Sequence, residues 1–160
     1  MYIQSMPRTL RDDLRQTKPF TSLQHEAMLN VLRTSATMTD ALEELLKQHG
    51  ITGTQYNVLR ILRGAEPGGL CRNELRDRML TRMPDVTRLL DRMEESGLVA
   101  RSRDNEDRRL VSTRITKAGR ELVDALDAPV NQFHRRSLGH LTEEQLTGLI
   151  ELLTLARNTA

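Results

Sequence analysis

The sequence has few aromatic residues, a single cysteine and no long apolar run. Two phenylalanines, two tyrosines and no tryptophan among 160 residues argue against a ligand platform built from rings, as in RNA-binding modules that stack bases on aromatic side chains. The single cysteine, Cys71, cannot form an internal disulfide or a thiolate metal cluster, which fits a reducing compartment. No stretch approaches the ~18 apolar residues that a membrane span needs, so we expect no membrane partner.

The length and the composition predict one globular domain over residues 1–160. A chain of 160 residues falls within the ~100–200 residues of a typical domain. Its 38% of hydrophobic and 29% of charged residues are typical of a soluble fold. The first twenty residues include Arg8, Asp12 and Arg15 and have no apolar segment. We therefore expect no secretory signal and a cytoplasmic location.

Basic charge is concentrated in the middle of the chain. Residues 72–120 hold thirteen Lys/Arg against nine Asp/Glu, a net charge of +4, whereas the net charge is +1 over residues 1–71 and −3 over residues 121–160. Of the 24 basic residues 21 are arginine, whose planar guanidinium can bind a phosphate or a guanine at two points. A genome rich in G and C would produce the same bias, so composition alone leaves nucleic-acid binding open.

Helical periodicity covers the first half of the chain. Apolar residues at spacings of three and four predict a long helix within residues 20–50, whose length suggests packing against a partner chain, and a second helix over residues 54–64. A short third helix is expected over residues 71–79. In it Cys71 recurs at a spacing of four with two other apolar residues, so we interpret this cysteine as part of the core.

The second half is expected to form a fourth helix, a hairpin of two short strands and two C-terminal helices, over residues 82–96, 98–102, 110–115, 117–136 and 142–158. Pro84 would lie in the first turn of the fourth helix, and Pro129 would kink or split the penultimate one. Three short helices followed by a hairpin are typical of a winged helix-turn-helix. The fourth helix would then enter the major groove of DNA, and residues 98–115 would form the wing.

Several motifs in this region occur at a definite mutual spacing. They are DVTRLLDRME at residues 85–94, GLVAR at 97–101, DRR at 107–109 and ITKAGR at 115–120, preceded by GIT at 50–52 and QYNVL at 55–59. In these motifs the chain resembles the MarR family of bacterial transcription regulators over about residues 23–157. The resemblance implies a mainly α fold with a small β-hairpin wing. A winged helix-turn-helix domain over residues 54–116 would be flanked by N- and C-terminal dimerisation helices over residues 20–50 and 117–158.

The resemblance also implies how such a chain acts. It implies a homodimer whose two winged domains lie in successive major grooves of a pseudo-palindromic operator in double-stranded DNA. In a repressor of this kind a small-molecule effector releases the operator. The protein would be cytoplasmic, and associated with the nucleoid when bound to DNA.

On the resemblance, the DNA-binding residues are Arg82, Asp85, Thr87 and Arg88 in the major-groove helix and Asp107, Arg108 and Arg109 in the wing. Arg72 is a further candidate, as a phosphate clamp, because it starts the third helix and both helix N-termini and arginine favour anions. An arginine at position 88 can bind guanine O6 and N7 together. The alternatives for Arg88 are a solvated helix face or an ion pair with Asp91 or Glu95, and for Arg72 an ordinary solvated side chain. Residues 104–106 are acidic or neutral where many members have further basic residues, which argues against a deeply inserted basic wing.

Family members respond to small aromatic acids or phenols, to thiol oxidation or to metals. The first of these is favoured, because Cys71 is interpreted as buried and the four histidines lack the i, i+4 spacing of two metal ligands on one helix. The expected walls of an aromatic or phenolic effector pocket are His25, Met28, Leu32, Tyr56 and Arg60. The same residues could simply be packed core. No metal or other cofactor is predicted.

Two other classes of protein compete with a DNA-binding regulator. An enzyme is disfavoured, because the sequence has no Gly-rich phosphate loop, nucleophile elbow or HExxH helix. A dimeric protein-interaction scaffold that has lost DNA binding is opposed by the retained arginines at positions 82, 88, 108 and 109. A regulator that responds to no ligand also remains as an alternative.

Overall fold

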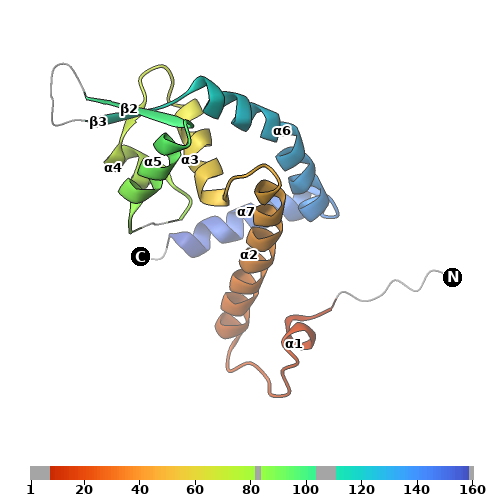
Figure 1. Ribbon diagram of the computed structural model, residues 1–160. Helices are drawn as coiled ribbons and strands as arrows, with labels where there is room; N and C mark the ends of the chain where they lie inside the picture. Colours follow the sequence, from red (N-terminus) through yellow and green to blue (C-terminus); the bar gives the residue numbers. More distant parts are fainter. Residues whose placement is uncertain (1–7, 82–83, 104–110, 159–160) are drawn as a thin grey trace. The chain divides into compact units, whose positions relative to one another are not determined.

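A computed structural model describes residues 8–81, 84–103 and 111–158 of the chain (Figure 1). Its elements are α1 (Leu10–Asp13), α2 (Leu23–Lys47), α3 (Gly53–Arg63), β1 (Leu70–Cys71), α4 (Arg72–Arg78), α5 (Val86–Glu95), β2 (Val99–Arg103), β3 (Val111–Ile115), α6 (Lys117–Leu138) and α7 (Glu143–Arg157). The mainly α fold with a small hairpin is thereby confirmed. The chain divides into two compact units between Ala41 and Leu42, within α2.

The first unit contains α1 and the beginning of α2. Thr9 caps α1, because its backbone N–H donates to the Asp12 carboxylate at 2.9 Å while its hydroxyl accepts the N–H of Asp12. Ser22 precedes α2, and its hydroxyl accepts the N–H of His25 at 3.1 Å. Helix α2 thus lies within the range of residues 20–50 that the sequence predicts for it.

The second unit is built around one hydrophobic core. It combines the last turns of α2 with α3, α5, α6 and the sheet, and its fully buried side chains include Leu46, Leu59, Leu62, Met93 and Leu126. Outside this core, the Arg63 guanidinium at the end of α3 binds both Asp124 and Asp127 of α6, at 2.6 and 2.9 Å. The ion pair lowers the pKa of Asp127 and ties α6 to the helix-turn-helix region.

A three-stranded antiparallel sheet in the order β1-β3-β2 supports the wing. The predicted hairpin is confirmed as β2 and β3, with Val99 opposite Ile115 and Arg103 opposite Val111. Strand β1 was not predicted, because a two-residue strand carries no readable alternation. Its pairing of Cys71 with Ser112 joins the start of α4 to the middle of the hairpin.

Three details of the predicted elements are wrong. Helix α5 begins at Val86 with Asp85 as its N-cap, so Pro84 precedes the cap instead of lying in the first turn. Helix α6 is not split at Pro129, because the buried Leu126 and Val130 hold both halves of the helix against the core and offset the missing hydrogen bond. Cys71 is only half-buried, since it belongs to β1 and precedes α4.

Candidate DNA-binding surface

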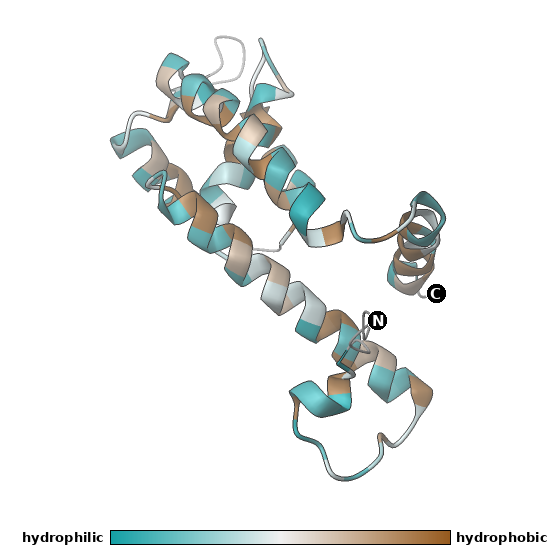
Figure 2. Cartoon of the chain, turned by 90° about the vertical axis from the view of Figure 1, so that its right-hand side faces the viewer, coloured by the Kyte–Doolittle hydropathy of each residue, from teal (hydrophilic) through white to brown (hydrophobic). Residues whose placement is uncertain are grey.

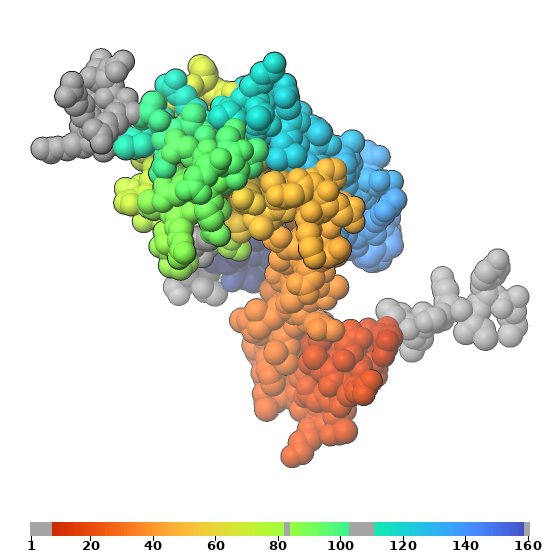
Figure 3. All heavy atoms as spheres, in the orientation of Figure 1, coloured from red at the N-terminus to blue at the C-terminus, as the bar shows by residue number. Residues whose placement is uncertain are grey.

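Helix α5 has one buried face and one exposed face. Val86, Leu89, Leu90 and Met93 are buried at spacings of three and four, which fixes the helix on the core. Thr87, Arg88 and Arg92 lie off this stripe and are exposed. In the space-filling view of Figure 3 the green atoms of α5 form part of the outer surface. The helix therefore presents polar side chains outward from a rigid support.

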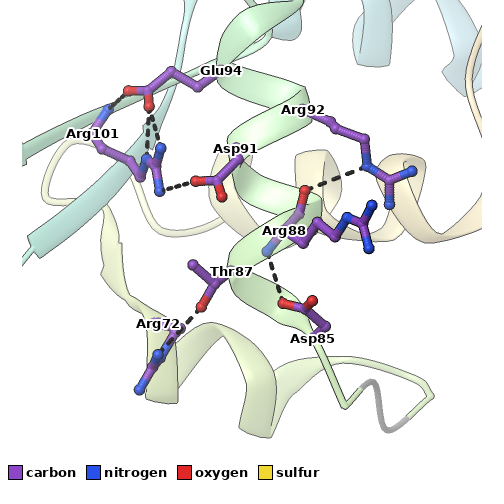
Figure 4. Close-up of polar contacts among 8 residues, drawn as sticks. All are labelled: Arg72, Asp85, Thr87, Arg88, Asp91, Arg92, Glu94 and Arg101. Carbon is purple, nitrogen blue, oxygen red and sulfur yellow. Dashed lines mark hydrogen bonds and ion pairs between the residues drawn. The ribbon is translucent and has the colours of Figure 1, made fainter.

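Asp85 and Arg88 start this exposed face. The Asp85 carboxylate accepts the backbone N–H of Arg88 at 2.9 Å, so it caps the helix (Figure 4). The Arg88 guanidinium has no hydrogen bond or ion pair within residues 8–81, 84–103 and 111–158. The ion pair with Asp91 that was the alternative for Arg88 is not formed, because Asp91 binds Arg101.

The structure brings two more of the predicted DNA-binding residues together. Arg72, the first residue of α4, donates from Nη1 to the Thr87 hydroxyl of α5 at 3.2 Å. Both line a pocket of about 380 Å³ between α4, α5 and the sheet, and Arg101 lines it as well. Among the described residues Arg72 has no carboxylate partner. It is therefore a cation held beside α5 and still able to bind a phosphate.

Arg101 of β2 is a residue whose role the sequence did not reveal. Its guanidinium binds Asp91 Oδ1 at 2.7 Å and Glu94 Oε2 at 2.5 Å, both on α5, and its backbone N–H donates to Glu94 Oε1 at 2.9 Å. Hydrogen bonds from Arg101 lower the pKa of Glu94, so this carboxylate stays charged at neutral pH. Only tertiary structure brings these side chains together, so no local pattern indicated the cluster.

Four predicted DNA-binding residues, Arg82, Asp107, Arg108 and Arg109, lie outside the described residues. Their contacts with DNA therefore stay predictions.

The residues expected to line an effector pocket occur in both units. His25, Met28 and Leu32 belong to the first unit, where the His25 Nδ1 lies 2.9 Å from the Thr21 hydroxyl oxygen and Met28 and Leu32 are exposed. In the second unit Tyr56 is only 6% exposed, and burial raises the pKa of its phenol.

The Arg60 guanidinium carbon lies 5.9 Å from the centre of the Tyr56 ring. Tyr56 belongs to the hydrophobic core, which was the alternative to a place in the pocket. The pocket itself stays a prediction.

The described part of the chain lacks two other kinds of feature. No group of three or more His, Cys, Asp or Glu side chains there could hold a metal ion. None of its helices has both the length and the apolar character needed to cross a membrane.

Comparison with known proteins finds relatives in sequence and in fold. Residues 49–110 match the model of the MarR family. The chain is 30% identical over 109 residues to the homoprotocatechuate degradative operon repressor of Escherichia coli, covering 68% of this chain and 72% of that one.

Two solved structures extend the comparison over most of the chain. A MarR transcription factor from Planctomyces limnophilus is 42% identical, with a TM-score of 0.66, over 86% of this chain and 99% of that one. A mutant of Escherichia coli MarR, solved in complex with operator DNA, is 25% identical with a TM-score of 0.75, over 85% and 99% of the two chains. These relatives are regulators and not enzymes, and they share the winged helix-turn-helix. The chain belongs to the MarR family of transcription regulators.

Proposed function

We propose that the protein is a homodimeric repressor that binds a pseudo-palindromic operator in double-stranded DNA. The observation that carries this proposal is the exposed polar face of α5, where the Arg88 guanidinium has no partner within the described residues and Arg72 is hydrogen-bonded to Thr87. A related protein, Escherichia coli MarR, binds operator DNA. In this proposal residues 54–116 form the DNA-binding region, and residues 20–50 and 117–158 form the dimerisation helices.

Each residue has a definite task in this proposal. Arg88 reads a guanine in the major groove, Thr87 contacts a phosphate or a thymine methyl group, and Asp85 holds the start of α5. Arg72 clamps a phosphate. Arg82, Arg108 and Arg109, which lie outside the described residues, are proposed to contact the DNA as well. Asp107 is proposed to orient Arg109.

The exposed apolar side chains of α2 and α7 support a dimer. On α7, Ile150, Leu152 and Leu155 are exposed, Leu155 to 71%, and no residue of this helix is buried. Figure 2 shows brown, apolar residues along both helices. Exposed apolar side chains gathered along a helix often mark a protein interface. A second copy of the chain is the partner that covers it in this proposal.

The first test is salt-dependent binding to duplex DNA. The purified protein is titrated by fluorescence anisotropy against the DNA flanking its own gene and against a random duplex of equal length. We expect binding to the flanking operator to be about 10³–10⁷ times tighter, with an affinity that falls steeply as salt increases. If neither duplex is bound at any salt concentration, the protein is the dimeric scaffold and not a DNA-binding repressor.

A small aromatic or phenolic effector is the finer part of the proposal. In this proposal the exposed Arg60 guanidinium binds the carboxylate of an aromatic acid, and the Tyr56 ring, 5.9 Å away and almost wholly buried in the core, lies behind it. The other residues assigned to the pocket are His25, Met28 and Leu32. A regulator that responds to no ligand is the alternative.

Salicylate is a suitable probe for the effector. We expect millimolar salicylate to weaken operator binding about 5- to 150-fold, the usual range of coupling between two sites. The response should be smaller for Arg60→Ala, whose side chain is exposed and whose loss should leave the fold intact. An operator affinity that is independent of salicylate and of simple phenols would favour the ligand-independent regulator.

A further inference from the structure

The ion-pair cluster at the base of the wing joins two DNA-binding elements. Arg101 on β2 makes every contact of the cluster with α5, through its backbone N–H and its side chain. The two oxygens of Glu94 accept from different parts of Arg101, Oε1 from the backbone N–H at 2.9 Å and Oε2 from Nε at 2.8 Å. Figure 4 shows Arg101 on one side of α5 and the guanidinium groups of Arg88 and Arg92 on the other. The cluster thus lies on the Thr87 side of α5, away from Arg88 and Arg92, and Arg101 lines the same pocket as Arg72 and Thr87.

This arrangement fixes a strand as well as a side chain. The Glu94 carboxylate accepts hydrogen bonds from both the backbone N–H and the guanidinium of Arg101. It therefore fixes the position of the strand along α5 and the orientation of the arginine side chain. The link between α5 and β2 is short, from Ser96 to Leu98, and contains Gly97 with a φ of 70°. Because β2 is the first strand of the wing, the cluster fixes this strand against α5.

We propose that Arg101 and Glu94 are positioning residues for DNA binding, which hold the wing and α5 at the angle at which both reach one operator half-site. The inference rests on the proposed function, because it assumes that both elements contact DNA. The cluster is partly solvent-exposed, with the Arg101 side chain 26% exposed, and such ion pairs add little to global stability. Its loss should therefore change DNA binding more than folding.

Removal of the Glu94 carboxylate distinguishes a positioning role of the cluster from a purely electrostatic effect on DNA binding. If the cluster acted only through its charge, deleting a carboxylate from a DNA-binding helix would strengthen binding to phosphates. If it positions the wing, the same deletion weakens binding although the protein becomes more basic. The two explanations therefore predict opposite signs for one substitution.

The experiment compares Glu94→Ala with Glu95→Ala, a matched change of charge at an exposed neighbour on the same helix. Both full-length variants and the wild type are titrated with the operator and with a random duplex over a series of salt concentrations. For Glu94→Ala we expect operator binding about tenfold weaker, because the three hydrogen bonds from Arg101 to Glu94 that position β2 are lost in each protomer. We also expect a smaller dependence of log K on log salt, because fewer phosphates are contacted. Glu95→Ala should bind as tightly as the wild type or more tightly.

A conservative variant checks that the effect is not a folding defect. Glu94→Gln keeps an acceptor for the Arg101 N–H and loses the charge, so its operator affinity should lie between those of Glu94→Ala and the wild type. It also carries the test if Glu94→Ala does not fold by circular dichroism. Operator binding by Glu94→Ala and Glu94→Gln that equals or exceeds that of Glu95→Ala would overturn the inference. Failure of the wild type to bind duplex DNA would instead overturn the proposed function.

Discussion

A chain carrying Leu152→Glu and Leu155→Glu is expected to be monomeric and to bind the operator about 10²–10⁴-fold more weakly than the wild type, because two linked winged domains become independent. Both leucines are among the exposed apolar residues of α7, so burying two carboxylates there would be costly in a dimer and harmless in a single chain. Sedimentation velocity measures the oligomeric state, and fluorescence anisotropy measures the operator affinity.

The matched control places the same charges on the polar side of the same helix. Thr147→Glu with Thr154→Glu adds two carboxylates at exposed positions and removes no apolar surface. We expect this variant to stay dimeric and to bind the operator nearly as the wild type does. A Leu152→Glu, Leu155→Glu chain that sediments as a dimer with unchanged affinity would show that α7 is not the interface.

Much of the fold could be predicted from the sequence, because its signals are local. The apolar spacing on α2, α3 and α5 indicated these helices, and the structure places all three within a few residues of the predicted ranges. The errors arose where a contact distant in the sequence decides the structure. Cys71 fits a helical stripe, yet pairing with β3 draws it into a strand, and the core packing of α6 carries that helix through Pro129.

The candidate site was less predictable than the fold. The residues on the exposed face of α5 could be named, because their positions follow from helical geometry once the buried stripe is known. The hydrogen bond from Arg72 to Thr87 could not be foreseen, since it joins different helices across fifteen positions. For the same reason Asp91 looked like a partner for Arg88, whereas the fold gives it to Arg101.

Replacement of Arg88 by alanine is expected to weaken operator binding roughly 30-fold to 10⁴-fold. One bidentate contact with guanine is worth about 1–3 kcal/mol, and a dimer on a two-fold operator loses it twice, about 2–6 kcal/mol in all. The fold should be unaffected, because the side chain is exposed and alanine favours the helix. The measurement is the ratio of operator affinity to random-duplex affinity, which should fall because random DNA does not offer the guanine in register.

Two matched variants separate base reading from charge at this position. Arg92→Ala removes the same charge one turn further along α5, where the Arg92 side chain donates to the Arg88 carbonyl oxygen at 3.4 Å. It should weaken binding to the operator and to the random duplex slightly and by the same factor. Arg88→Lys keeps the charge and loses the planar fork, so it should retain binding to random DNA while losing preference for the operator. An Arg88→Ala variant with the wild-type affinity ratio would show that Arg88 reads no base. Specificity would then have to come from other parts of the surface, of which the Arg72–Thr87 pair is nearest in the fold.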